Sequence, residues 1–286
     1  MKAENLVIAS VFYNQNCWGN LITRAIMPFI KQRFKAAIIS YSVYLSTLQG
    51  DHLVISFNIS VNPEEFTNQF NTFIGNFIAR YPSKTLPPAY PLDSLFMDYP
   101  NNRLYFGIEK KLVLPPGAIQ YGITSAIISG LAVNDMDEGA RFTFILYMQL
   151  AVIKAKYNDM NDACNAIAQI SEYVLAHNPG TAPTAALPQQ YAEIQQQLYD
   201  SNNNILQEII TDIWNTENYS PELLWLEDWI SVCRELTKAH DIIQPFLTIS
   251  RSIFEQMGLS DTHLQYLLLN IYYKSFKTNL NTFYYE

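Results

Sequence analysis

Alternating apolar and polar residues near position 55 restrict the fold more than any other feature of the sequence. In QGDHLVISFNIS, residues 49–60, every second residue from Leu53 to Ile59 is apolar, and the residues between them include serine and asparagine. A period of two predicts a β-strand with one buried face. The Gln-Gly-Asp turn before it and the apolar run 37–48 predict a hairpin that contains this strand. A lone histidine, His52, opens the strand and is the first candidate functional residue.

The rest of the first third alternates between strand and helix patterns. Residues 6–13 (LVIASVFY) form an apolar run of strand length, and residues 18–34 place apolar side chains at helical spacing. Pro28 inside that second run predicts a kink or a restart of the helix. Asn62, which is followed by a proline, predicts a capped helix start. One face of that helix is apolar: Phe66, Phe70, Phe73, Ile74 and Phe77.

A proline-rich segment separates this part from a mostly helical remainder. Residues 82–102 carry five prolines and predict a loop or an extended arm, and residues 103–114 predict a further strand. From about residue 118 onward the pattern is mostly helical, with helices expected at 142–156, 162–176, 205–214, 221–230 and 260–277. The predicted architecture is α+β in a single domain, residues 1–286. A small mixed β-sheet with helices occupies about 1–117, and the part from 118 to 286 is predominantly helical.

Composition disfavours several classes of function. Hydrophobic residues make up 49% and charged residues 15% of the chain, as in a folded globular protein. The net charge of −8 disfavours a nucleic-acid-binding surface. The sequence contains no uninterrupted apolar run of membrane-spanning length, and its opening segment does not resemble a signal peptide. Three widely spaced cysteines favour a reduced, cytoplasmic location over a disulfide framework.

The sequence also lacks the short motifs of common catalytic sites. The four histidines, at 52, 177, 240 and 263, have no spacing typical of a metal site. No glycine-rich phosphate loop and no Gly-x-Ser-x-Gly elbow occurs. We therefore expect neither a metal nor a cofactor.

Three segments carry a family resemblance: HLVISF at 52–57, GAIQYGI at 117–123 and YLLLNI at 266–271. Together with the order of strands and helices, they resemble the elimination domain of lantibiotic dehydratases, which also occurs free-standing as the thiopeptide-type bacteriocin biosynthesis domain. The resemblance covers nearly the whole chain. In that family the domain expels glutamate from a glutamylated serine or threonine of a precursor peptide and leaves a dehydroamino acid. Relatives join two dehydroalanines in a formal cycloaddition that makes a pyridine ring.

The resemblance implies which partners to expect. The first is a precursor peptide, and a separate glutamyl-transferring dehydratase subunit is a second. A homodimer is also open. From charge and hydropathy we expect no binding of nucleic acid by the chain itself and no membrane partner.

The chain departs from the family motifs at positions that carry charge. Where the family has H-L-R-L-R-F, the chain keeps His52, but Val54 and Ser56 replace both arginines. Where the family has E-x-x-R-Y-G-G, Gly117 replaces the acid and Gln120 replaces the arginine.

The third motif, H-M-x-x-N-R, is altered at its histidine. Tyr266 stands in that place, Asn270 matches the asparagine, and His263 lies one helical turn earlier on the same face. The residues implied as catalytic are His52, Tyr121, His263 and Tyr266. Those implied as substrate-binding are Ser56, Gln120 and Asn270. We expect four of these to line one cleft: His52, Ser56, Tyr121 and Tyr266.

These departures have a chemical consequence. Elimination of glutamate needs a base, cationic donors for the developing enolate, and an acid or cation for the leaving carboxylate. Removing one such donor commonly costs about 2–4 kcal/mol in barrier height. We therefore expect the chain to eliminate glutamate poorly.

Three interpretations remain open. The chain is a peptide-modifying enzyme, for which cyclisation needs mainly binding and orientation with a neutral donor such as tyrosine. Alternatively, it is a non-catalytic partner that binds the precursor or a dehydratase subunit. Thirdly, it is an unrelated α+β binding protein. Each candidate also has a structural interpretation, with His52 as a half-exposed strand residue and the tyrosines as core or groove wall.

Overall fold

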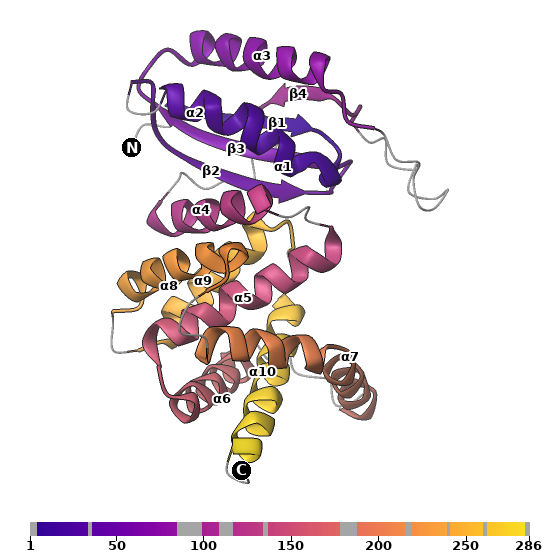
Figure 1. The fold of residues 1–286 in the computed structure, drawn as a ribbon, viewed down its shortest axis with the longest axis vertical. Helices are drawn as coiled ribbons and strands as arrows, with labels where there is room; N and C mark the ends of the chain where they lie inside the picture. Colours follow the sequence, from indigo (N-terminus) through magenta and orange to yellow (C-terminus); the bar gives the residue numbers. More distant parts are fainter. Residues whose placement is uncertain are drawn as a thin grey trace. The chain divides into compact units, whose positions relative to one another are not determined.

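The chain folds into two compact units. The computed structural model describes residues 5–33, 36–84, 99–108, 117–133, 137–177, 188–215, 219–238, 241–259 and 262–283. The first unit comprises Met1–Arg141 and Glu255–Leu259, and the second comprises Phe142–Phe254 and Ser260–Glu286. The first helix of the predicted helical part therefore belongs with the sheet (Figure 1).

Four strands form the sheet of the first unit: β1 (Leu6–Phe12), β2 (Ile38–Ser46), β3 (His52–Ile59) and β4 (Arg103–Phe106). Their order is β2-β3-β1-β4, and each neighbouring pair is antiparallel. The α+β class is confirmed, but the described pairs are all antiparallel and not mixed as expected. The reason is that each helical crossover skips one strand position, and a strand of opposite direction fills it. This is the split βαβ arrangement of ferredoxin-like folds.

The predicted hairpin is confirmed and fixes the register of β2 against β3. Gln49 and Gly50 in the turn both have positive φ, 59° and 108°, as tight hairpin turns require. The register places Ser42 opposite Ser56 and Ser46 opposite His52.

The predicted break near Pro28 is a short π-helical turn. Helix α1 (Trp18–Leu21) continues through η3 (Ile22–Ile26) into α2 (Met27–Arg33). The Met27 amide donates to the Ile22 carbonyl, five residues back. Proline has no amide hydrogen to continue the regular α-helical ladder, so the widened turn just before Pro28 accommodates the change.

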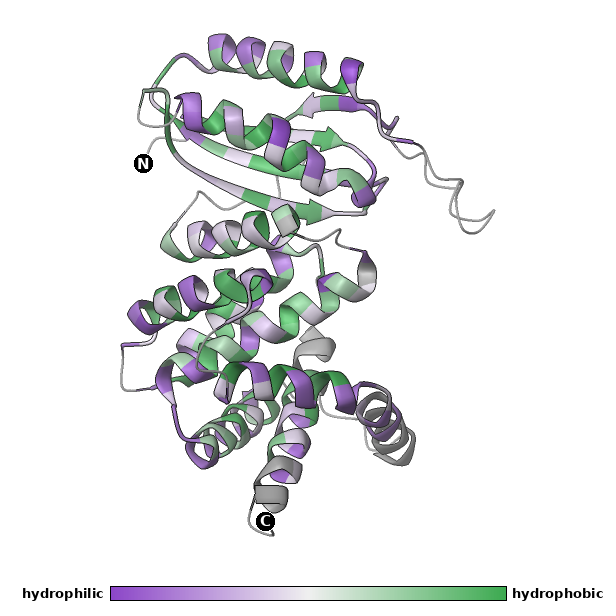
Figure 2. Cartoon of the chain, viewed as in Figure 1, coloured by the Kyte–Doolittle hydropathy of each residue, from purple (hydrophilic) through white to green (hydrophobic). Residues whose placement is uncertain are grey.

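Helix α3 (Pro63–Arg80) begins as predicted and packs its aromatic face on the sheet. Asn62 Oδ1 accepts from the amides of Glu64 and Glu65 at 2.8 and 3.2 Å. The Phe57 ring of β3 lies 5.1 Å from Phe66 and 5.2 Å from Phe70. Phe29 of α2 lies 5.0 Å from Phe70, so α2 and α3 cover the same sheet face (Figure 1). Figure 2 shows the hydrophilic residues of α3 on its outer side.

Side chains satisfy the free edge of β2. The Val43 amide donates to Thr124 Oγ1, on α4 (Ala118–Val133), at 3.0 Å. Gln256 Nε2 donates to the Val43 carbonyl and to Thr124 Oγ1, each at 2.9 Å. Unpaired backbone groups on an edge strand are a liability for aggregation, so this clamp of Thr124 and Gln256 closes the edge.

Two glycines allow close backbone approach in the first unit. Gly258 has a φ of +74°, and a Cβ there would lie 2.3 Å from the Leu45 carbonyl oxygen. A Cβ on Gly19 would lie 2.3 Å from the Leu131 carbonyl oxygen, which is where α1 meets α4. No larger residue fits either position without a backbone shift.

Helices make up the described second unit: α5 (Glu138–Lys156, from Phe142 on), α6 (Met160–His177), α7 (Pro188–Trp214), α8 (Leu224–Leu236), α9 (Ile243–Gln256, to Phe254) and α10 (Thr262–Phe283). A 3₁₀ turn at Pro221–Leu223 precedes α8. Helix α10 packs against α6 and α7. Sequence patterns predicted each of these helices except α9, which no expectation covered.

Hydrogen bonds tie the second unit together between helices. Trp229 Nε1 donates to the Met148 carbonyl at 3.0 Å, and the Tyr272 hydroxyl donates to Gln149 Oε1 at 2.7 Å. Burial raises the pKa of Tyr272 well above its usual value, so this hydroxyl stays protonated.

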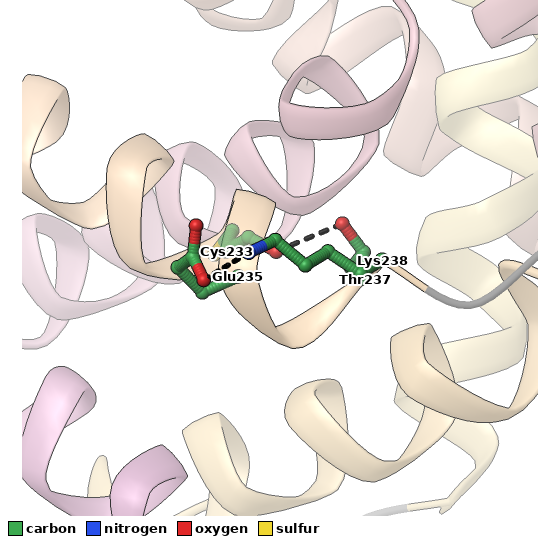
Figure 3. Close-up of polar contacts among 4 residues, drawn as sticks. All are labelled: Cys233, Glu235, Thr237 and Lys238. Atoms are coloured by element: carbon green, nitrogen blue, oxygen red, sulfur yellow. Dashed lines mark hydrogen bonds and ion pairs between the residues drawn. The ribbon is translucent and has the colours of Figure 1, made fainter.

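Figure 3 shows the end of α8, where Lys238 pairs with Glu235. Both of these side chains are exposed, so the pair contributes little stability.

Candidate functional site

The sheet face opposite α2 and α3 carries polar residues at adjacent positions. Ser42 and Ser56 are direct cross-strand partners, Ser10 is opposite Val54, and Phe12 is opposite His52. Because side chains of paired residues point to the same side, these residues share one face. We call Ser10, Ser42, His52 and Ser56 the serine–histidine face.

The serine–histidine face is fully buried, and its hydroxyls lack partners. Ser10, Ser42, His52 and Ser56 each expose 0% of their surface. Within the described residues, the Oγ atoms of all three serines make no hydrogen bond. A buried polar group without a partner costs about 1–3 kcal/mol. The three serines therefore form a cluster of unused hydrogen-bonding groups on one face of the sheet.

His52 is held in one ring orientation. Its Nδ1 lies 2.7 Å from the Gly50 carbonyl oxygen, and its ring stacks on Phe12 at 4.3 Å between centroids. A carbonyl oxygen only accepts, so Nδ1 carries the proton and Nε2 is the acceptor nitrogen of the neutral ring. The sequence led us to consider a half-exposed histidine, but the ring is fully buried.

An aromatic cluster adjoins His52. Tyr99 and Tyr105 pack on Phe12 with ring centroids 4.9 and 5.7 Å away, and on each other at 5.0 Å. Arg103, opposite Phe12 in the register, is exposed. Arg103 is the one cationic side chain on this face among the residues of the four described strands. Among the described strand residues, no lysine, arginine or carboxylate side chain therefore lies at the buried centre of this face.

The structure places Gln120 and Tyr121 on α4, away from the contacts of this face. Gln120 Oε1 accepts from the Gly117 amide at 3.3 Å, which caps the start of its own helix. Tyr121 is 46% exposed, and its ring lies 5.8 Å from that of Tyr41. Tyr41 is opposite Phe57 in the register, so its side chain lies on the other face of the sheet from Ser56.

The three C-terminal candidates lie on α10 in the second unit. Asn270 is half-buried. The backbone of His263 and Tyr266 is helical, and their side chains lie outside the described part of the structure. The cleft expected from His52, Ser56, Tyr121 and Tyr266 therefore stays a prediction. Of the seven candidates, His52 and Ser56 lie on the same strand and the same sheet face.

Sequence reasoning missed two members of the serine–histidine face, Ser10 and Ser42. The signal for Ser42 was present, because serines alternate with tyrosine and valine in the β2 sequence SYSV (40–43). Ser10 interrupts an otherwise apolar strand in LVIASVF (6–12). What the sequence did not contain is the strand order that places both next to Ser56.

Two searches of the described residues gave negative results. Among them, no cluster of three or more His, Cys, Asp or Glu side chains has the placement to hold a metal ion. Among the same residues, no helix is both long and apolar enough to cross a membrane.

Known proteins resemble this chain in fold but not closely in sequence. No protein-family profile and no curated protein sequence matches the chain. Solved structures, however, share this α+β fold over nearly its full length. The fold that the family resemblance implied is therefore confirmed.

Those structures include the pyridine synthase TbtD from thiomuracin biosynthesis, which is 14% identical with a TM-score of 0.58 over 96% of this chain and 98% of TbtD. TsrL is 9% identical with a TM-score of 0.53 over 96% of this chain and 95% of its own. The tRNA-dependent lantibiotic dehydratase MibB from Microbispora sp. 107891 is 11% identical with a TM-score of 0.45 over 99% of this chain and 29% of MibB.

Proposed function

We propose that this protein matures a ribosomally synthesised, post-translationally modified peptide, binding a precursor peptide and cyclising its dehydroamino acids. The observation that carries the proposal is the fold shared with the pyridine synthase TbtD, which spans 96% of this chain and 98% of that enzyme. The likeness covers nearly the whole of both chains. We propose that both units, residues 1–286, act together as one functional domain in the cytoplasm.

The chemistry of the sheet face favours cyclisation over glutamate elimination. Val54 and Ser56 occupy positions where the resembled family has arginines, and no described strand residue places a lysine or arginine at the buried centre of the face. A leaving carboxylate in such surroundings lacks the cation that would stabilise it. Joining two neutral alkenes releases no carboxylate and depends mainly on holding both in position.

The residue roles within this proposal follow the family resemblance. We propose His52, Tyr121, His263 and Tyr266 as groups that donate or accept protons, and Ser56, Gln120 and Asn270 as substrate-binding groups. Contacts in the first unit support these roles unequally. Ser56 has an unpartnered buried hydroxyl, whereas Gln120 already caps its own helix.

A second candidate is a non-catalytic partner that binds the precursor peptide or a glutamyl-transferring dehydratase subunit. The contacts of His52 favour it: the ring is stacked on Phe12, bonded to the Gly50 carbonyl and buried, as in a histidine that supports a strand end. Because the ring is held on two sides, it has little freedom to turn between a proton donor and a proton acceptor.

Two synthetic peptides distinguish the candidates. One carries a glutamylated serine, and the other carries two dehydroalanines at a spacing that permits ring closure. Each is incubated with the purified protein and analysed by mass spectrometry. Unreacted dehydroalanines are then counted by adding a thiol, because cycloaddition consumes both alkenes and thereby removes two sites of thiol addition.

We expect no glutamate loss from the first peptide and a loss of thiol addition in the second. Loss of one glutamic acid per modified serine would show elimination and contradict the proposal. Binding of the second peptide without reaction would support the non-catalytic candidate. No binding of either peptide would refute both candidates.

A further inference from the structure

The three serine hydroxyls form one continuous group on the sheet. Ser42 and Ser56 are direct partners on β2 and β3, and Ser10 on β1 lies diagonally across from Ser56. Directly opposite residues have Cβ atoms about 5 Å apart, and diagonal ones about 7 Å. The three side chains therefore span about 12 Å, which is the length of about three to four residues of an extended chain at ~3.4 Å per residue.

Burial without partners separates these serines from ordinary strand serines. Each exposes 0% of its surface, and each hydroxyl lacks a hydrogen bond within the described residues. Each hydroxyl offers one donor and two acceptor positions. Three unpaired buried hydroxyls lower the free energy of unfolding unless they gain partners.

We infer that Ser10, Ser42 and Ser56 form a binding site for an uncharged, amide-bearing ligand, namely the peptide groups that flank a dehydroamino acid. This inference rests on the proposed function. Amide carbonyls accept from serine hydroxyls, and amide hydrogens donate to them, so both halves of a peptide group find a partner. The aromatic cluster of Phe12, Tyr99 and Tyr105 beside the site suits a planar, conjugated residue.

The same site discriminates against carboxylates. A carboxylate moved to a buried site without a cation loses its hydration, and serine hydroxyls return only part of that loss. The exposed Arg103 at the β4 edge lies outside the buried centre. In the unliganded structure the three hydroxyls are fully buried.

The test uses the full chain and a small probe, N-acetyl-dehydroalanine N-methylamide, with N-acetylglutamate as the charged comparison. Binding is measured by ligand-observed NMR for the wild type and for a variant that combines Ser42→Ala and Ser56→Ala. Ser40→Ala is the matched control, because Ser40 lies on the same side of β2 but is partly exposed. Thermal unfolding of each variant is recorded alongside.

We expect the double variant to bind the neutral probe at least about tenfold more weakly, since two hydrogen bonds are lost. Its unfolding midpoint should equal or exceed that of the wild type, because two unpaired hydroxyls are removed. The control should change neither value. N-acetylglutamate should bind more weakly than the neutral probe in every case.

Two results would overturn the inference: unchanged affinity in the double variant, or an unfolding midpoint several degrees lower. The second would mean that the hydroxyls already have partners in the unliganded protein. Serine-dependent binding of the probe without any reaction of the two-dehydroalanine peptide would uphold the site and refute the cyclising activity. Cyclisation of that peptide that persists in the double variant would uphold the activity and refute the site.

Discussion

Replacing Gln256 with leucine tests whether the side-chain clamp on β2 stabilises the first unit. Gln256 Nε2 lies 2.9 Å from the Val43 carbonyl, 2.9 Å from Thr124 Oγ1 and 3.3 Å from the Gln120 carbonyl. Its two hydrogens serve two of these acceptors at a time. Leucine fills a similar volume but donates nothing, so the change removes hydrogen bonds with little change in packing.

The magnitude follows from counting the groups left without a partner. The buried Val43 carbonyl loses its donor, which costs about 1–3 kcal/mol, and the bond to Thr124 is worth about 1 kcal/mol. Leucine also removes Gln256 Oε1, which is buried without a partner in the described part of the chain, and this returns about 1 kcal/mol. We therefore expect Gln256→Leu to lower the free energy of unfolding by about 1–3 kcal/mol.

Urea unfolding followed by circular dichroism measures the change. Gln244→Leu is the control, because Gln244 lies on the same helix and bonds to the Tyr173 hydroxyl at 2.8 Å, but at an exposed site. Its effect should stay within about 0.5 kcal/mol. If Gln256→Leu costs no more than this control, the clamp does not stabilise the edge and the reasoning fails.

Two further predictions concern the same unit. Gly19→Ala should lower the free energy of unfolding by about 1–3 kcal/mol, because its Cβ would lie 2.3 Å from the Leu131 carbonyl oxygen. Gly75→Ala, which has open space around it in α3, should raise the free energy of unfolding by about 0.5–1 kcal/mol. Equal denaturation midpoints for the two variants would contradict this prediction. Burial, with the nearby Tyr121 second, raises the pKa of Tyr41 from 10.0 to about 12. The unfolded chain therefore loses this proton first, and the unfolding free energy falls as pH rises from 10 toward 12. Tyr41→Phe should lessen that fall, and an identical pH profile in urea titrations would refute the assignment.

Local sequence periodicity determined most of the secondary structure. The alternation around Leu53, the turn at Gly50 and the cap at Asn62 predicted the hairpin and the start of α3, and the structure confirms them. These features depend on residues a few positions apart, so a single sequence contains the whole signal. Helix α9 was missed although its start carries local signals: Asp241 Oδ1 accepts from the Ile243 amide, and Pro245 lies in the first turn.

Tertiary structure alone decided the candidate site. The sequence identified His52 and Ser56, but only the strand order β2-β3-β1-β4 places Ser42 and Ser10 beside them. Strand order depends on which crossover packs where, and no local period encodes it. The same holds for the return of Glu255–Leu259 to the first unit, where Gln256 meets a strand more than two hundred residues away in the chain. Helices α2 and α3 pack on one face of the sheet, and the three serines lie on the other face because of the register of the strands.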